Sequence, residues 1–151
     1  MDKVEDVMLD LAWRRISDLW QDKQELENKA GILLASNGVL LGFVANAWNM
    51  LNHWLALAGI VCMWFSAISC VLALRTRKYK EFDILESWEE FKEYFEDVYL
   101  LKRGLYSTLG SMEKINRDLV ADIAKWYSKG VWLFLGSMSF IMLSLLASFF
   151  V

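Results

Sequence analysis

The chain contains no proline, one histidine and only two cysteines among its 151 residues. Without proline, nothing in the sequence forces a long helix to end or kink. A single histidine offers no histidine pair and no His-rich zinc cluster within one chain. Cys62 and Cys70 lie in an apolar stretch with no CxxC or Cys/His spacing, so we expect packing residues rather than a disulfide or a metal site.

Charge is missing from two long stretches. No Asp, Glu, Lys or Arg occurs between Lys29 and Arg75, or after Lys129. The first stretch is 45 residues long, about twice the ~20 residues that a helix needs to cross a bilayer. It must therefore fold back on itself, and the polar residues 49–53 in its middle, flanked by tryptophans, mark the predicted turn.

These patterns, with 56% hydrophobic residues, predict an all-α integral membrane protein: three transmembrane helices with a cytoplasmic helical bundle formed by helix extensions and a helical hairpin. The chain is predicted to be a single domain. Its parts in order are a cytoplasmic amphipathic helix (2–29), a first span (30–50), a second span (54–74), a cytoplasmic helical hairpin (75–129) and a third span (130–151).

Basic residues gather on one side of the predicted spans. Lys and Arg next to spans are retained in the cytoplasm, so we expect a multi-pass protein of the inner (plasma) membrane, with its N-terminus in the cytoplasm and its C-terminus outside. The first 29 residues carry five basic and eight acidic side chains, which is untypical of a cleavable signal peptide. The basic residues at the predicted membrane edge are Lys29, Arg75, Arg77, Lys78 and Lys129.

The charged segments carry apolar stripes at helical spacing. In the N-terminal segment the stripe is Leu9, Trp13, Ile16 and Trp20, which favours one helix from about residue 3 to about residue 50. Such stripes must be buried, and a cytoplasmic bundle is the simplest way to bury them.

The central segment contains two further stripes, and the sequence Lys102-Arg103-Gly104 lies between them. We predict a helix break there, with Gly104 as a C-terminal cap. The acidic run from Glu86 to Asp97 is interpreted as the solvated face of the first of these helices rather than a cation site. The two stripes are Ile84, Trp88, Phe91, Phe95 and Val98, then Leu105, Leu109, Met112, Asn116, Leu119, Ile123 and Trp126.

Few residues suggest chemistry. His53 is interpreted as an exposed turn residue, with pH sensing or ion attraction as the alternative. No GxSxG, Walker or GxGxxG motif is present, so no enzyme, no catalytic residue, no metal and no cofactor are expected. The net charge of −3 makes nucleic acid an unexpected partner.

Small residues line one face of the first predicted span. This small-residue stripe permits close helix contact, either with another span of the same chain or with other subunits around an axis. Asn37 and Asn46 need partners at bilayer depth, and they could bond across helices or line a narrow polar path. Ser137, Ser144 and Ser148 share a face of the third span and are taken as packing residues. The stripe consists of Gly31, Ala35, Gly38, Gly42, Ala45 and Asn49.

The segment KAGILLASNG, residues 29–38, is followed by a short turn and a second span. It resembles the "D/N-K-A-x-x-L-L-x-x-N" entry of small prokaryotic membrane effectors, the Pycsar-type transmembrane effectors and related SLATT proteins of antiphage signalling systems. Residues 105–129, running into the last span, are similar in outline to the C-terminal part of those proteins. The resemblance implies a homo-oligomeric effector in the lipid bilayer, triggered by a nucleotide second messenger or a protein.

Three functional hypotheses follow. The first is an oligomeric inner-membrane effector or channel-like protein that permeabilises or perturbs the membrane when triggered through its cytoplasmic helices. The second is a membrane-anchored protein-interaction module without pore activity. The third, an intramembrane enzyme, is disfavoured because no nucleophile, base or metal set converges in the sequence.

Overall fold

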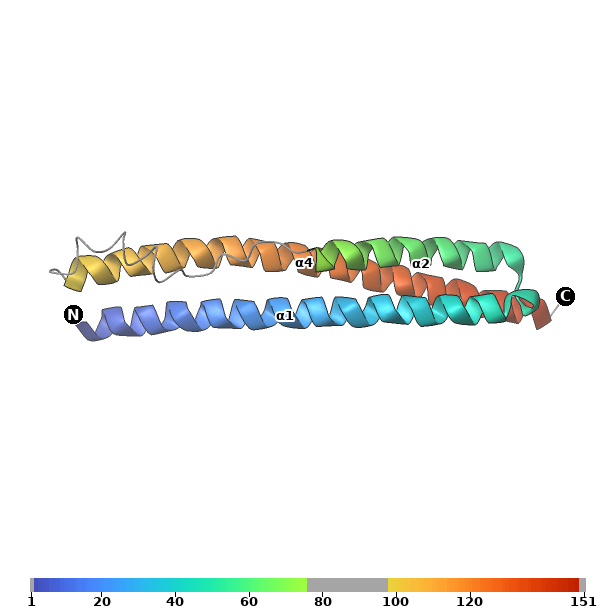
Figure 1. The fold of residues 1–151 in the computed structure, drawn as a ribbon, viewed down its shortest axis with the longest axis horizontal. Coiled ribbons are helices and arrows are strands. Elements are labelled where there is room, and N and C mark those ends of the chain that lie inside the picture. The colour runs from blue at the N-terminus through green and yellow to red at the C-terminus, as the bar shows by residue number, and fades with distance from the viewer. Residues whose placement is uncertain (1, 76–97, 150–151) are drawn as a thin grey trace. The chain divides into compact units, whose positions relative to one another are not determined.

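The computed structural model describes residues 2–75 and 98–149. These residues form helices and no strand: α1 (Asp2–Asn46), the short 3-10 helix η1 (Trp48–Met50), α2 (His53–Leu74) and α4 (Val98–Phe149) (Figure 1). The predicted all-α class is confirmed. Several predicted features lie outside the described residues, namely Arg77, Lys78, the apolar stripe that begins at Ile84, the acidic run from Glu86 and the ends of the chain.

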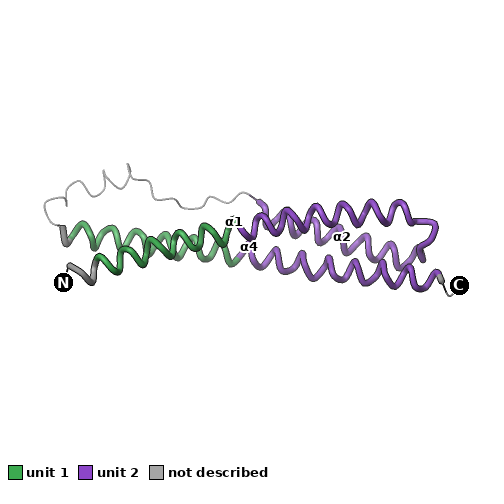
Figure 2. The backbone as a smooth tube through the Cα atoms, turned by 90° about the horizontal axis from the view of Figure 1, so that it is seen from below, with its two compact units in different colours: residues 1–24, 77–121 green, residues 25–76, 122–151 purple. Residues whose placement is uncertain are grey.

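The chain divides into two compact units (Figure 2). One comprises Met1–Gln24 with Arg77–Ala121, and we call it the charged unit. The other comprises Glu25–Thr76 with Asp122–Val151, and we call it the membrane unit. Both long helices, α1 and α4, supply residues to both units.

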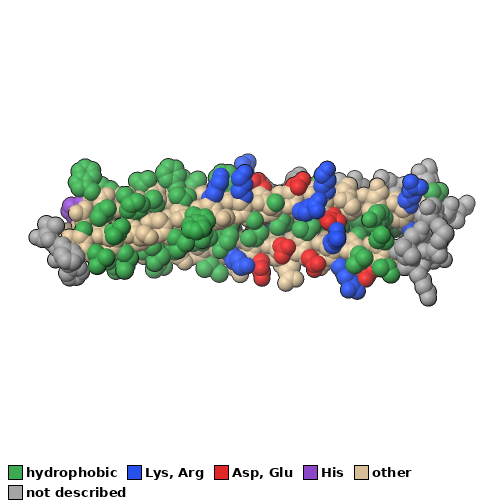
Figure 3. Space-filling view, turned by 180° about the vertical axis from the view of Figure 1, so that it is seen from behind, with side chains coloured by type: hydrophobic (Ala, Val, Ile, Leu, Met, Phe, Trp, Pro, Cys, Tyr) green, Lys and Arg blue, Asp and Glu red, His purple; other side chains and the backbone are tan. Residues whose placement is uncertain are grey.

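Three helices, α1, α2 and α4, each contain a stretch long and apolar enough to cross a membrane. The most apolar is α2, with a mean hydropathy of 2.3. Figure 3 shows a broad surface of hydrophobic side chains on which no Lys, Arg, Asp or Glu appears. Large apolar side chains of α1, α2 and α4 are exposed, among them Val39, Trp54 and Trp132. These features support the predicted membrane protein with three transmembrane helices.

The turn between α1 and α2 begins earlier than predicted. A single helix forms as expected, but it ends at Asn46, and η1 occupies residues that were assigned to the first span. Asn52 then caps α2, its side-chain oxygen accepting a hydrogen bond from the backbone N–H of Leu55 at 3.4 Å. Asparagine is among the best N-cap residues, which explains why α2 begins at His53 within this polar segment.

The predicted break at Lys102-Arg103-Gly104 is wrong. Helix α4 is continuous from Val98 to Phe149, and no glycine in the described residues has the positive φ of a helix cap. A glycine inside a helix costs only about 1 kcal/mol relative to alanine. The apolar stripe that follows outweighs this cost, because α4 buries Leu109, Met112 and Ile123 along one face.

In the charged unit, the described parts of α1 and α4 pack side by side and run parallel. Two ion pairs join them, Lys102 to Asp6 at 2.8 Å and Arg15 to Glu113 at 3.4 Å. The predicted stripe of α1 is correct at Leu9 and Ile16, whereas Trp13 and Trp20 are exposed and their neighbours Ala12 and Leu19 take their places. Ala12 is buried at 8% exposure, whereas Trp13 is 53% exposed. Between residues 6 and 20, the buried or half-buried positions of α1 follow the three-four spacing of a helix pair and are Leu9, Ala12, Ile16 and Leu19.

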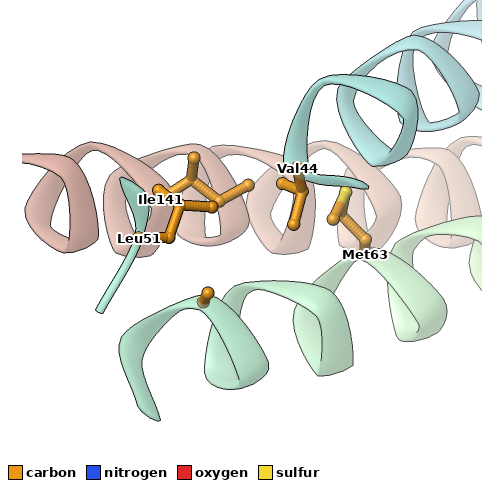
Figure 4. Packing of buried hydrophobic residues seen from close by; sticks show 5 residues of the cluster. Val44, Leu51, Met63 and Ile141 are labelled. Carbon is orange, nitrogen blue, oxygen red and sulfur yellow. The ribbon is translucent and has the colours of Figure 1, made fainter. Parts of the chain in front are cut away.

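The core of the membrane unit combines all three helices. Val44 of α1, Met63 of α2 and Ile141 of α4 converge with Leu51 of the turn (Figure 4). Each of these four side chains is at most 4% exposed. The turn is therefore part of the packed core, and it fixes the end of α1 against α2 and α4.

Candidate functional site

The small-residue stripe of α1 does not contact the other helices at its glycines. A Cβ atom added at Gly31, Gly38 or Gly42 would meet no other atom within 4 Å. Gly31 is half-buried, and the other residues of the stripe are exposed, namely Ala35, Gly38, Gly42, Ala45 and Asn49. Within the described residues, the stripe is therefore an outer surface of the membrane unit.

Close packing inside the membrane unit depends on two other glycines, which the sequence interpretation missed. A Cβ atom at Gly59 of α2 would lie 3.0 Å from Ile141 Cγ1 and 3.3 Å from the Ser137 carbonyl oxygen on α4. A Cβ atom at Gly130 of α4 would lie 3.2 Å from Cys70 Sγ. Neither glycine belongs to a GxxxG pair, so motif spacing gives no signal. The alternation of Ala56, Gly59, Met63 and Ser66 at three and four residues could have indicated the buried face of α2.

A polar cluster connects the three helices of the membrane unit. Asn37 Nδ2 of α1 donates to Ser66 Oγ of α2 at 3.1 Å. Ser66 Oγ in turn donates to the Gly130 carbonyl oxygen of α4 at 2.8 Å. Ser66 is fully buried and Asn37 is 5% exposed. Such hydrogen bonds between helices in lipid contribute about 0.6 kcal/mol on average. The cluster therefore joins α1 to α2 and α2 to α4 through the same Ser66 hydroxyl.

The cluster leaves one acceptor unused. Ser66 has one hydroxyl proton, and that proton goes to Gly130. The group of Asn37 that faces Ser66 must therefore be its NH2 end, which also donates to the Leu33 carbonyl oxygen at 3.0 Å. The other end of the amide, Oδ1, is buried and has no hydrogen-bond partner. If the two ends of the Asn37 amide were exchanged, Oδ1 would face Ser66 Oγ. Ser66 could not donate to it, because its only proton is already donated to Gly130.

The structure does not bring Asn37 and Asn46 together. Asn46 is exposed, and its Nδ2 donates to the Gly42 carbonyl oxygen of its own helix at 3.0 Å. Asn37 instead points into the membrane unit, toward Ser66. The two amides therefore lie on different faces of α1 and share no polar path within the described part of one chain.

A groove lies between α1 and α2, beside the small-residue stripe. It encloses about 250 Å³, and nearly all of its lining is apolar. Gly38 belongs to both features, and Asn37 also lines the groove. The lining residues are Leu34, Asn37, Gly38, Leu41, Met63, Trp64 and Ala67.

The turn of the membrane unit is held to α4 by serine. Ser144 Oγ donates to the Asn52 carbonyl oxygen at 2.9 Å, and the Asn52 N–H donates to the Ser144 carbonyl oxygen at 3.4 Å. Ser137 and Ser148 bond carbonyl oxygens of their own helix. His53 is exposed and stacks on Trp48, with ring centroids 5.1 Å apart. Ser144 therefore connects α4 to the turn, and His53 lies at the surface of that turn.

The described basic residues at the predicted membrane edge lie where the apolar stretches end. Lys29 pairs with Glu25 at 3.1 Å, and Lys129 Nζ lies 4.3 Å from the centre of the Trp126 ring. Arg75 is exposed directly after α2. Positive charge thus follows or precedes each apolar stretch of the described residues.

Removal of the Ser66 hydroxyl tests the polar cluster. Ser66→Ala is expected to destabilise the membrane unit by about 1 kcal/mol, because it removes two hydrogen bonds between helices. The measurement is reversible unfolding in mixed detergent micelles. Ser139→Ala is the matched control, since exposed Ser139 bonds only Leu135 of its own helix. Equal stability of both variants would show that the cluster adds nothing to stability.

No metal site accompanies these features. Among residues 2–75 and 98–149, no three or more His, Cys, Asp or Glu side chains are grouped to hold a metal ion. Cys62 and Cys70 are free thiols, half-buried and buried. The candidate features of the membrane unit are thus the outer small-residue stripe, the groove and the polar cluster. The chain matches no model of a known protein family, and no curated protein and no solved structure was found to be similar to it.

Proposed function

We propose that this protein is an oligomeric inner-membrane effector or channel-like protein, which permeabilises or perturbs the membrane when triggered through its cytoplasmic helices. In this proposal the charged unit lies in the cytoplasm, and copies of the chain associate in the bilayer through the small-residue stripe of α1. The trigger is a nucleotide second messenger or a protein.

The observation that carries the proposal is the outward position of the stripe. Each glycine inside a helix costs about 1 kcal/mol relative to alanine, and Gly31, Gly38 and Gly42 gain no packing partner from their own chain. Lipid does not offset this cost, because a larger apolar side chain would suit it equally well. A second helix does, since small residues let two backbones approach closely in a membrane.

Two further points support regulation through the charged unit. Helices α1 and α4 each supply residues to both units without a break. A ligand that displaces these helices in the charged unit therefore acts on the spans through continuous backbone. The resemblance of residues 29–38 to small antiphage membrane effectors points to the same kind of activity, in which assembly in the membrane leads to its permeabilisation.

Expression of the whole chain in bacterial cells tests the activity. We expect the membrane potential, read with a potential-sensitive dye, to collapse when the chain is expressed together with its trigger. It should also collapse when the chain alone is expressed at a high level. Gly38→Leu should abolish the collapse. Gly136→Leu should preserve it, because Gly136 on α4 likewise has no atom within 4 Å of an added Cβ but lies outside the stripe. A potential that survives high expression of an assembled protein would rule out the effector function.

One observation favours the alternative, a membrane-anchored protein-interaction module. A second groove, of about 260 Å³, lies in the charged unit between α1 and α4. Its exposed apolar residues are Met8, Leu11 and Tyr106, and the Arg15–Glu113 ion pair lies in its lining. If the protein is such a module, the charged parts of α1 and α4 should still recruit the partner after all three spans are exchanged for unrelated ones. An effector should lose its activity after the same exchange.

A further inference from the structure

The groove between α1 and α2 is the place where the membrane unit is least complete by itself. Asn37, which lines it, carries a buried oxygen without a donor. Trp64, which lines the opposite side, is 65% exposed halfway along the 22-residue helix α2. Tryptophan is favoured at the membrane interface, where its N–H finds a partner. At mid-membrane, lipid chains offer that N–H no acceptor.

Two occupants could fill this groove, a lipid chain or a helix. A lipid chain fills the apolar volume but has neither donors nor acceptors for Asn37 and Trp64. A protein helix brings backbone and side-chain polar groups together with apolar surface. It also gains close approach, because Gly38 leaves the edge of the groove without a side chain. Polar groups without partners in lipid favour the occupant that carries polar groups.

We infer that a second copy of this chain seats a transmembrane helix in the groove between α1 and α2, so that Trp64 of α2 belongs to the contact between subunits. This inference rests on the proposed oligomer and extends it, because the small-residue stripe alone requires only α1. The contact then spans two helices of one subunit, and it removes the Trp64 indole from lipid.

A photo-crosslinking amino acid of the benzophenone type at position 64 identifies the occupant directly. The protein is the whole chain in liposomes of phosphatidylglycerol and phosphatidylethanolamine. We expect a covalent dimer from position 64. Position 65 is the matched control, because Phe65 is 56% exposed on α2 but does not line the groove, and it should give lipid adducts instead of dimer.

Alanine variants supply a second readout that does not depend on the bulky probe. Trp64→Ala should weaken association about tenfold or more, the scale for loss of a central aromatic anchor. Phe65→Ala should leave association unchanged. Lipid adducts alone at position 64, or equal association of the two alanine variants, would overturn the inference. If the protein is still an oligomer in that case, the proposed function stands. A protein that is monomeric throughout would overturn both.

Discussion

Gly59→Leu is expected to destabilise the membrane unit by about 3 kcal/mol, the upper range for overpacking a core. An added Cβ atom at this position lies 3.0 Å from Ile141 Cγ1 and 3.3 Å from the Ser137 carbonyl oxygen. The side chain of Ile141 can shift, but the backbone of α4 can move only if the two helices separate. Unfolding in mixed micelles of increasing denaturing detergent measures the loss.

Two variants make this expectation specific. Gly59→Ala adds only the Cβ atom and should cost less than the leucine. Gly136→Leu adds the same leucine to α4 at a position with no atom within 4 Å of the new Cβ, and it should leave stability nearly unchanged. If Gly59→Leu unfolds no more easily than Gly136→Leu, α2 and α4 are not in the close contact described above.

Gly38→Leu and Gly42→Leu are expected to weaken assembly and to leave the stability of each subunit unchanged. Neither glycine has a neighbouring atom within 4 Å of an added Cβ, so leucine does not disturb the fold of one chain. In the proposed oligomer the same leucine separates two helices, and association should weaken about tenfold or more, at least ~1.4 kcal/mol. Sedimentation equilibrium in mild detergent measures the change.

Stability measurements distinguish glycines that pack within one chain, such as Gly59, from glycines of the outer stripe, such as Gly38. Unfolding curves of Gly38→Leu should match those of the original chain measured at a concentration where subunits are apart. Unchanged association together with lower stability would place the stripe inside the chain, against α2 or α4. That outcome would remove the main support for an oligomer.

The sequence predicts the helices well because its signals are strong and local. Two charge-free stretches, and the polar residues in the middle of the first one, are enough to place three membrane helices and a turn near residues 49–53, and α1 and α2 lie on either side of that turn. The end of α1 was misplaced because η1 continues the chain in a helical conformation without the α-helical pattern. The break was predicted from Gly104 and the two basic residues before it, although the apolar stripe that follows outweighs one glycine.

Packing between helices was harder to predict. The GxxxG pair Gly38–Gly42 is conspicuous in the sequence, yet the close contacts of the fold involve the isolated Gly59 and Gly130. Helical spacing identifies a face with small residues but does not tell which neighbour that face meets. The cluster of Asn37, Ser66 and Gly130 joins residues 29 and 64 positions apart, and only the pairing of the three helices reveals it.

The mass of the assembled protein is the most direct test of whether copies of the chain associate through the small-residue stripe. Native mass spectrometry of the whole chain released from nanodiscs counts subunits in multiples of 17.6 kDa. We expect a defined multiple of two or more, which falls to one subunit in Gly38→Leu and persists in Gly136→Leu. A single subunit of 17.6 kDa for the original chain, at every protein-to-lipid ratio, would contradict the proposed oligomer.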